Sequence, residues 1–317
     1  MRHLRWPVML VAGGAALVLP EFFVSAYRLG ILALVATYAI ASLAQNLLSG
    51  YADVPSLGNV TFFGLSAYAT GSLVSLGHVP IALAAFLAIL TAGGLGFVIG
   101  LPALRISGMH LAIVTLVLVF AGQEVMSQWD QHHNPSGVEV SSPAWLLQER
   151  GFYAAAVVLA VIAYLVVWNI LRSRSGRAIK ALSENPFAAA AIGIDPTRYR
   201  LQVFVVSGML TGAAGIVFLY STAHVNPATF SLDLSLAFLT MMILGGTRSL
   251  GGSLLGAVVI GLLPQVLDSF PTQLGNLRVQ DLGPAIYALL LLLTLRFFPE
   301  GIWNAIVTRC VLRRETT

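Results

Sequence analysis

The chain has 317 residues, of which 57% are hydrophobic and 9% are charged, and its formal net charge is +4. Soluble globular domains carry roughly 25% charged residues, so a chain this apolar cannot cover its surface with polar groups, and lipid must be the solvent for much of it. The basic excess does not indicate nucleic acid binding, because Lys and Arg lie in short segments beside apolar runs. The single cysteine, Cys310, excludes an internal disulfide and a cysteine-rich metal site.

The N-terminal segment combines a basic start with an apolar core, MRHLRWP followed by VMLVAGGAALVLP. This pattern is similar to that of a secretory signal peptide. We expect a retained first span instead, because further spans follow at once and the segment has no convincing small-residue cleavage site.

Apolar runs that are long enough to cross a membrane recur along the whole chain. A straight helix needs about 20 apolar residues to span a hydrocarbon core of ~30 Å. The candidate spans are 7–26, 29–48, 60–77, 79–102, 108–126, 151–171, 201–222, 232–247, 252–268 and 282–298. The predicted fold class is therefore all-α, a polytopic membrane helix bundle with about ten transmembrane segments. The eighth and ninth flank GGTRSLGG, and they could be two full spans, two half-helices or one broken, re-entrant element.

Lys and Arg determine the predicted orientation. Arg2 and Arg5 place the N-terminus in the cytoplasm, and alternation through ten spans then places both termini there. The same alternation puts the 127–150 loop outside, where Arg150 is the only basic residue. It puts the 172–200 loop inside, with Arg172, Arg174, Arg177, Lys180, Arg198 and Arg200. Arg28 and Arg278 are the exceptions.

The predicted inner loop contains a short helix with clear start and stop signals. Asn185 is a favourable N-cap, and Pro186 suits the first helical position because its missing N–H would be unpaired there. The next residues, Phe187 to Ile192, propagate the helix, and Gly193 can take the left-handed conformation that ends it. Two helical turns are not stable alone, so this helix must rest on the protein or on a partner. A solvated basic loop beside anionic lipid head groups is the alternative interpretation.

A second cap-and-proline signal, Asp195-Pro196, starts the next helix, which continues into the 201–222 span. Only Gly193, Ile194 and Asp195 separate the two helices. A force on the short helix would therefore reach the membrane through a single hinge.

The chain has none of the common catalytic signatures. It contains no P-loop, no His-Glu-x-x-His and no nucleophile motif, so any ATP hydrolysis must occur in another subunit. The acidic residues nearest to apolar spans are Asp53 and Glu124, which we expect at solvated helix ends, Asp53 inside and Glu124 outside. Spans that are almost free of ionisable residues argue against an ion-coupled carrier.

Several ordered segments resemble the branched-chain amino acid ABC transporter permeases of the LivM type. The stretch from Ser173 to Ile194, SRSGRAIKALSENPFAAAAIGI, resembles the cytoplasmic loop of that family. The stretch from Gly50 to Gly71, GYADVPSLGNVTFFGLSAYATG, resembles an earlier segment of it. Asn226–Phe230, Met242–Gly246 and Gly251–Ala257 resemble its C-terminal half. The chain departs from the usual pattern at Asp53, Pro55 and Asn59.

The resemblance implies a permease subunit of an ATP-driven importer of branched-chain amino acids in the bacterial inner membrane. It implies one transmembrane permease domain over residues 1–317, with no enzyme activity and no cofactor of its own. The implied partners are a second permease subunit, homologous or identical, two cytoplasmic ATPase subunits, an extracytoplasmic substrate-binding protein and membrane lipid. Two alternatives stay open: a related importer of urea or short amides, and a secondary transporter or channel that works alone.

Two sets of candidate functional residues follow, the first from the resemblance and the second from the position of two segments before helices. The short helix becomes the coupling helix that contacts an ATPase subunit, through Glu184, Asn185, Pro186, Phe187, Ala188, Ala189, Ile192 and Gly193. The second set lies in two glycine-containing segments that directly precede helices, Ser56-Leu57-Gly58-Asn59 and Ser249-Leu250-Gly251-Gly252-Ser253.

Helix N-termini carry free N–H groups and partial positive charge, which suit a carboxylate. In the functional interpretation, the carboxylate of an amino acid meets these N–H groups while its apolar side chain faces Phe62 and Phe63. In the alternative interpretation, the two segments only cap two membrane helices.

Overall fold

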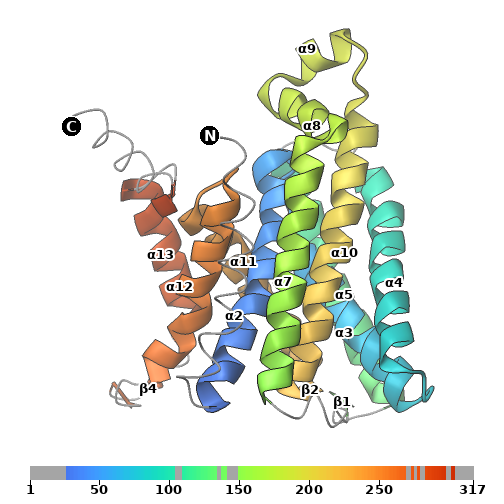
Figure 1. Ribbon diagram of the computed structural model, residues 1–317, viewed down its shortest axis with the longest axis vertical. Helices are drawn as coiled ribbons and strands as arrows, with labels where there is room; N and C mark the ends of the chain where they lie inside the picture. Colours follow the sequence, from blue (N-terminus) through green and yellow to red (C-terminus); the bar gives the residue numbers. More distant parts are fainter. Residues whose placement is uncertain are drawn as a thin grey trace.

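The structure is a computed structural model that describes residues 26–103, 109–133, 137–140, 149–268, 273–274, 277–278, 283–297 and 301–303. Its long helices lie side by side in a bundle, and two short helices project beyond one end, which we call the α9 end (Figure 1). The opposite end is called the β1 end. The predicted first span, except Ala26, and Cys310 lie outside the described residues.

The first half of the bundle follows the predicted order of apolar runs. Its elements are α2 (Ala26–Gln45), the π-helix η1 (Asn46–Tyr51), α3 (Asn59–Ser75), α4 (Ile81–Ala103), α5 (Met109–His133), β1 (Val138–Glu139) and α7 (Glu149–Arg172). The second half contains α8 (Arg174–Glu184), α9 (Pro186–Ala191), α10 (Pro196–Thr222), β2 (His224–Val225), the 3-10 helix η2 (Pro227–Phe230), α11 (Leu232–Gly245), α12 (Leu250–Asp268), β3 (Gln273–Leu274), β4 (Leu277–Arg278) and α13 (Gly283–Phe297).

Five of the described helices are long and apolar enough to cross a membrane. They are Tyr27–Tyr51, Ile81–Ala103, His110–His133, Arg150–Arg172 and Pro196–Thr222. Leu232–Gly245 and Leu250–Gln265 are apolar but shorter. This architecture confirms an all-helical polytopic membrane protein.

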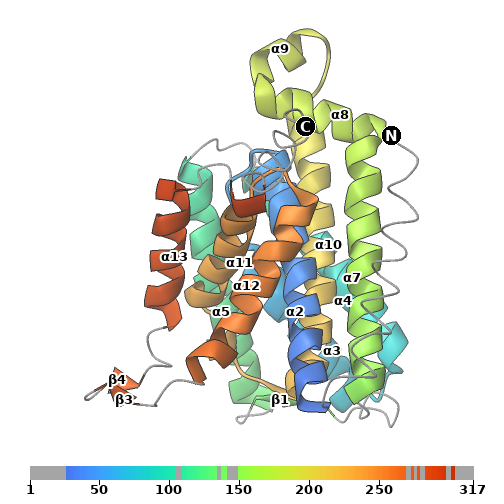
Figure 2. The same ribbon diagram turned by 60° about the vertical axis from the view of Figure 1, so that its left-hand side comes forward.

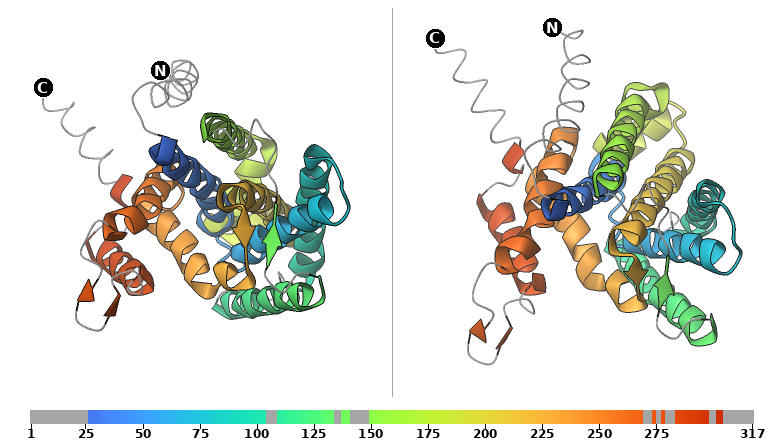
Figure 3. Two further views of the ribbon diagram at one scale, coloured as in Figure 1. Left: turned by 90° about the horizontal axis from the view of Figure 1, so that it is seen from below. Right: turned by 60° about the horizontal axis from the view of Figure 1, so that its bottom comes forward.

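Helix α10 is the centre of the packing. It lies against α2, α3 and α4, whereas α5 and α13 lie at the edge of the bundle (Figure 3). Gly208, Gly212 and Gly215 of α10 allow the neighbouring helices to approach closely. A Cβ atom added at Gly212 would lie 2.5 Å from Ser66 Oγ on α3 and 2.9 Å from Ala92 Cβ on α4. A larger side chain at Gly212 would push α10 away from both neighbours.

The segments that flank GGTRSLGG are two separate helices, not one broken element. At 1.5 Å per residue, the 14 residues of α11 span about 21 Å and the 19 residues of α12 about 28 Å. The two helices pack so closely that a Cβ atom added at Gly256 would overlap the Met241 carbonyl oxygen. Helix α11 is thus shorter than a ~30 Å hydrocarbon core, and α12 nearly matches it.

Helix α5 is longer than its hydropathy predicts. It continues to His133, seven residues beyond the predicted end and into the 127–150 segment that we expected to be a loop. The reason is that the added residues, SQWDQHH, are polar but contain neither glycine nor proline, and polarity alone does not end a helix. Beyond α5, β1 pairs antiparallel with β2, with Val138 opposite Val225, and so connects this loop to the end of α10. A second antiparallel pair joins β3 and β4.

The predicted inner loop contains a second helix, α8, that the sequence analysis missed. Ser173 caps it by accepting a hydrogen bond from the Gly176 N–H at 3.3 Å. Its buried side consists of Gly176, Ala178, Ile179 and Leu182, which lie on one face at helical spacing. Helix α8 contacts α7, α10 and η1 and lies across the end of the bundle (Figure 2). It therefore forms the support from which α9 projects.

Candidate functional site

The projecting helix α9 has the start and stop signals that the sequence predicts. The Asn185 side-chain oxygen accepts hydrogen bonds from the N–H groups of Phe187 at 3.1 Å and Ala188 at 3.0 Å. Pro186 is its first residue, and Gly193 follows it with φ +86°. The Asp195 carboxylate then caps α10 through Thr197 and Arg198. The local geometry of the predicted short helix is confirmed, and its contact with an ATPase subunit stays a prediction.

Helix α9 exposes large apolar side chains outside the apolar part of the bundle. Phe187 is 88% exposed and Ile192 is 76% exposed, whereas Ala189 is buried. Glu184, Asn185, Pro186, Ala188 and Gly193 are also exposed. Because α9 projects beyond the ends of the long helices (Figure 1), lipid tails do not cover these side chains. Exposed apolar residues of this kind indicate a surface for a protein partner.

The two glycine-containing segments meet at a break in one helix. Helix α2 widens into the π-helix η1 at the junction of Gln45 and Asn46. These neighbouring amides bind different segments. Gln45 binds the segment before α3, and Asn46 binds Ser249 and Ser253 at the start of α12. We call the connected set the polar belt. It comprises Gln45, Asn46, Ser49, Ser56, Asn59, Ser207, Ser249 and Ser253.

The α3 side of the polar belt depends on Gln45. Its Nε2 donates to the Ser56 carbonyl oxygen at 2.8 Å, and its Oε1 accepts from Asn59 Nδ2 at 2.6 Å. Asn59 Nδ2 also donates to Ser207 Oγ on α10 at 3.2 Å. Ser207 Oγ donates in turn to the Ala44 carbonyl oxygen at 2.9 Å. The belt thus joins α2, α3 and α10.

The α12 side of the belt depends on Asn46. Its Nδ2 donates to Ser253 Oγ at 2.7 Å and to the Ser249 carbonyl oxygen at 2.9 Å. Its Oδ1 accepts from the Arg248 N–H at 3.0 Å, and Arg248 Nε donates to the Gly50 carbonyl oxygen at 3.1 Å. Segments about 190 residues apart in the sequence are therefore held on two sides of the same helix break.

The N–H groups that could bind a carboxylate form hydrogen bonds within the chain. Leu57 donates to Thr115 Oγ1 at 3.0 Å, and Gly58 donates to Ser56 Oγ at 3.2 Å. Gly252 donates to Ser249 Oγ at 3.1 Å, and Ser253 donates to the Ser249 carbonyl oxygen. Gly251 packs against the Trp303 ring. In this conformation the segments cap their helices, and their use in substrate passage stays a prediction.

Phe62 and Phe63 are buried in the protein core. Phe62 packs edge-on against Phe204 of α10, with ring centroids 5.8 Å apart. Phe63 lies within 6 Å of three rings, those of Phe218, Phe230 and Phe238. These contacts join α3 to α10, η2 and α11. Both rings are fully buried in this conformation, and a role of either ring in substrate passage stays a prediction.

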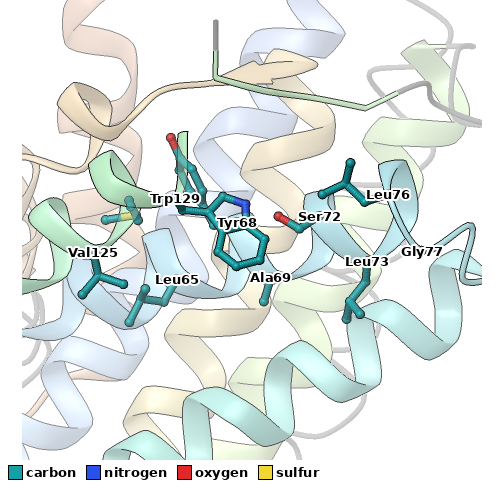
Figure 4. A pocket seen from close by; sticks show the side chains of 10 residues that line it. Leu65, Tyr68, Ala69, Ser72, Leu73, Leu76, Gly77, Val125 and Trp129 are labelled. Atoms are coloured by element: carbon teal, nitrogen blue, oxygen red, sulfur yellow. The ribbon is translucent and has the colours of Figure 1, made fainter. Parts of the chain in front are cut away.

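A cavity of about 540 Å³ lies between α3 and α5, toward the β1 end (Figure 4). It is lined by Leu65, Tyr68, Ala69, Ser72, Leu73, Leu76, Gly77, Val125, Met126 and Trp129. Beside it, the Tyr68 hydroxyl donates to the buried Asp130 carboxylate at 2.9 Å. The volume of the cavity is in the range of small-molecule sites. Sequence reasoning missed this cavity because Trp129 lies beyond the predicted end of the span.

The sequence analysis also identified only some residues of the polar belt. Ser56, Asn59, Ser249 and Ser253 belong to the predicted segments, but Gln45, Asn46 and Ser207 were not singled out. The available signal was the presence of two adjacent amides inside an apolar run, since buried amides in membranes need partners. Within the described ranges, His, Cys, Asp and Glu side chains form no group of three that could hold a metal ion.

Comparison with known proteins identifies the family. The model of the family described as branched-chain amino acid transport system / permease component matches residues 27–295. The high-affinity branched-chain amino acid transport system permease protein LivM of Salmonella typhimurium is 28% identical over 281 residues, which cover 78% of this chain and 65% of that protein. The chain thus spans just under two thirds of the length of this relative.

Two further relatives differ in coverage. The probable branched-chain amino acid transport permease protein LivM of Methanocaldococcus jannaschii is 23% identical, over 84% of this chain and 90% of that protein. The ribose import permease protein RbsC of Haemophilus influenzae is 32% identical over a shorter region, 34% of this chain and 35% of that protein. Since the family match extends over most of the sequence, the chain belongs to the family of branched-chain amino acid transport system permease components.

Proposed function

We propose that the chain is the permease subunit of an ATP-driven importer of branched-chain amino acids in the bacterial inner membrane. Its partners in this proposal are a second permease subunit, identical or homologous, two ATPase subunits and a soluble substrate-binding protein. The observation that carries the proposal is α9, a capped helix that exposes Phe187 and Ile192 beyond the bundle. The relatives named LivM support the choice of substrate.

The distribution of basic residues supports a cytoplasmic α9 end. The described Lys and Arg residues that lie toward this end are on α7, α8, α10 and α13 and in the turn before α12: Arg172, Arg174, Arg177, Lys180, Arg198, Arg200, Arg248 and Arg296. Only Arg28, Arg150 and Arg278 lie toward the β1 end among the described residues. Loops rich in Lys and Arg stay on the cytoplasmic side of a membrane. A cytoplasmic ATPase subunit would therefore meet α9.

Helix α9 suits the transmission of movement from such a partner. It is attached to α10 through Gly193, Ile194 and Asp195, and Gly193 has a left-handed conformation. Helix α10 begins at Pro196 and reaches Ser207 of the polar belt after 11 residues, about 16 Å along its axis. A displacement of α9 would thus reach the contacts among α2, α3 and α10.

The proposal is tested by reconstituting the chain with its candidate partners in proteoliposomes and measuring uptake of radiolabelled leucine. We expect uptake to require ATP, the binding protein and both ATPase subunits. Uptake of leucine by this chain alone, without ATP, would show that it is a secondary transporter or channel. ATP-driven uptake of urea, a short amide or ribose, but not of leucine, would retain the importer and refute the substrate.

The role of α9 is tested in the same assay with Phe187→Asp. We expect ATP-driven uptake to fall at least about tenfold, because a buried apolar anchor contributes 2 kcal/mol or more to a protein interface. Thr197→Asp is the matched control, since it adds the same charge at an exposed position in the first turn of α10, where an acidic group is favourable. Full uptake by the Phe187→Asp transporter would show that α9 does not contact the ATPase subunit.

A further inference from the structure

Helix α5 changes character halfway along its exposed face. Between Leu111 and Phe120 the exposed side chains are apolar: Ile113, Val114, Val117 and Phe120. From residue 124 onward the exposed face is mostly polar and includes Glu124, Gln128, His132 and His133. We call residues 124–133 the outer half of α5. A face that lipid covers throughout would stay apolar, so the outer half of α5 faces something else.

Glu124 lies deep within this helix. It is nine residues from the helix end at His133, which corresponds to about 14 Å. The whole helix of 25 residues is about 37 Å long, some 7 Å more than a ~30 Å hydrocarbon core. The apolar run ends near residue 126, so the excess lies at the His133 end and Glu124 lies close to the outer boundary of the hydrocarbon core. Glu124 therefore does not lie at the end of the helix, as the sequence predicted, because α5 continues to His133.

The carboxylate of Glu124 has no basic partner in its own segment. The sequence contains neither Lys nor Arg between Arg105 and Arg150. The hydrogen bond observed for this carboxylate comes from Gln128 Nε2, at 2.8 Å. An ionisable side chain on a membrane-spanning helix faces water or the interior of an assembly, and such residues often line a pathway for solute or ions. Glu124 is thus an anionic group that can accept a cationic group from a solute.

The surroundings of Glu124 combine an anionic group with an apolar cavity. A hollow of about 310 Å³ is lined by Glu124, Val125, Gln128, Trp129, His132 and His133. Val125 and Trp129 also line the cavity between α3 and α5, so the two spaces adjoin. The carboxylate and amide can bind an ammonium group, and the aliphatic lining of the larger cavity can bury an aliphatic side chain.

We propose that the outer half of α5 lines the water-filled substrate passage, and that Glu124 binds the α-ammonium group of an amino acid while the cavity between α3 and α5 receives its aliphatic side chain. The identity of the solute rests on the proposed function, whereas the presence of water along α5 does not. Gln128 positions the Glu124 carboxylate through their hydrogen bond.

Water along α5 is tested by cysteine labelling in the assembled transporter. Cys310 is the only native cysteine, so a Cys310→Ala background allows single cysteines to be introduced. Gln128→Cys should react with a charged, membrane-impermeant methanethiosulfonate at least about tenfold faster than Val117→Cys, because thiols react as solvated thiolates. Val117 is the matched control, because it is 60% exposed on the apolar half of the same helix. Equal, slow labelling of both variants would show that lipid or a second subunit covers the outer half of α5, and would overturn the proposal.

The role of Glu124 is tested by Glu124→Gln, which removes the charge and keeps the shape. We expect ATP-driven leucine uptake to fall at least about tenfold, as for the loss of one charged hydrogen bond. We expect Asp233→Asn, which removes an exposed charge from the first turn of α11, to stay within about twofold. Glu124→Asp, which keeps the charge, should retain more uptake than Glu124→Gln.

The outcomes separate the two proposals. A wild-type transporter that does not import leucine refutes the proposed function and the ammonium site with it, while the labelling result still tests the passage. A wild-type transporter that imports leucine, together with an equally active Glu124→Gln variant, overturns the ammonium site alone. The ammonium site is also overturned if Glu124→Gln lowers the uptake of a solute without an ammonium group, such as ribose, by the same factor as it lowers leucine uptake. A melting temperature of Glu124→Gln equal to that of the wild type excludes misfolding as the cause of a loss.

Discussion

Replacing Asn46 by alanine should destabilise the bundle, because this one amide joins η1 to the start of α12. Its Nδ2 donates to Ser253 Oγ at 2.7 Å and to the Ser249 carbonyl oxygen at 2.9 Å, and its Oδ1 accepts from the Arg248 N–H at 3.0 Å. Alanine removes these three hydrogen bonds and a longer one from Nδ2 to the Gly246 carbonyl oxygen at 3.4 Å. Ser253 Oγ keeps its own hydrogen bond to Ser249, but the Arg248 N–H loses its acceptor.

The expected loss follows from these contacts. A hydrogen bond contributes about 1 kcal/mol net, and a buried donor without a partner costs about 1–3 kcal/mol. The side chain of Asn46 is completely buried, so water does not replace it without rearrangement. We therefore expect the free energy of unfolding to fall by about 3 kcal/mol. At about 2 °C per kcal/mol, the lower value for domains of 150–250 residues, this corresponds to a melting temperature lower by about 6 °C.

The measurement is thermal unfolding of the purified chain in one detergent, followed by tryptophan fluorescence and by loss of the monodisperse peak. Asn169→Ala is the control, because it makes the same chemical change at an exposed position of α7. We expect it to change the melting temperature by no more than about 1 °C. Equal melting temperatures of Asn46→Ala and Asn169→Ala would refute the structural role of the polar belt.

Three further substitutions test other parts of the structure. Gly256→Ala should destabilise the chain by more than about 2 kcal/mol, because the new Cβ atom overlaps a carbonyl of α11. The control Gly94→Ala has open space around it and should be neutral or stabilise the chain by up to about 1 kcal/mol. Thermal unfolding measures both. Phe63→Ala should lower the free energy of unfolding by about 3–5 kcal/mol in the same assay, and exposed Phe86→Ala should change it far less. Asn185→Ala should remove about 1 kcal/mol of local stability from α9, seen as several-fold faster cleavage there by a protease in limiting amount, with an unchanged melting temperature of the bundle.

Hydropathy predicted the spans well because a lipid environment acts on each segment separately. The bounds of α3, α4, α7 and α12 differ from the predicted spans by at most two residues. The predicted end of α5 was wrong because hydropathy indicates where lipid ends. A helix ends instead where its backbone loses hydrogen-bond partners or meets a glycine or proline. Polar residues such as Gln128 and Asp130 continue the helix, and their position becomes informative only once the helix is known to include them.

Helix α8 was not predicted because hydropathy gives no signal for it. Its sequence is polar and basic overall, and it lies between an apolar span and a conspicuous Asn-Pro signal. Its stability comes from burial of Ile179 and Leu182 against the ends of α7, α10 and η1, and these contacts depend on tertiary structure. By contrast, α9 was predictable from Asn185, Pro186 and Gly193, because capping is a local property of the backbone.

The polar belt could not be predicted, since it joins segments that are far apart in the sequence. Composition identified Ser56, Asn59 and Ser253 as residues before helices, but nothing in the sequence paired them with Gln45 and Asn46. The π-helical turn at this junction explains how two adjacent residues reach different segments, because the wider turn separates their directions more than an α-helix does. Such turns arise in tertiary context and leave no local signature.

In the proposed importer the polar belt would have to rearrange, and its chemical nature suits this role. Its members are neutral amides and hydroxyls, and each of their hydrogen bonds contributes about 1 kcal/mol net. Exchanging the contacts of Ser207 with Asn59 and Ala44 therefore costs no more than the binding of a partner at α9 can supply. A buried ion pair at the same place would resist this exchange, because separating it leaves an uncompensated charge that costs about 3–5 kcal/mol. The belt is thus strong enough to hold the helices at the break in α2, and weak enough for α10 to change its position relative to α3.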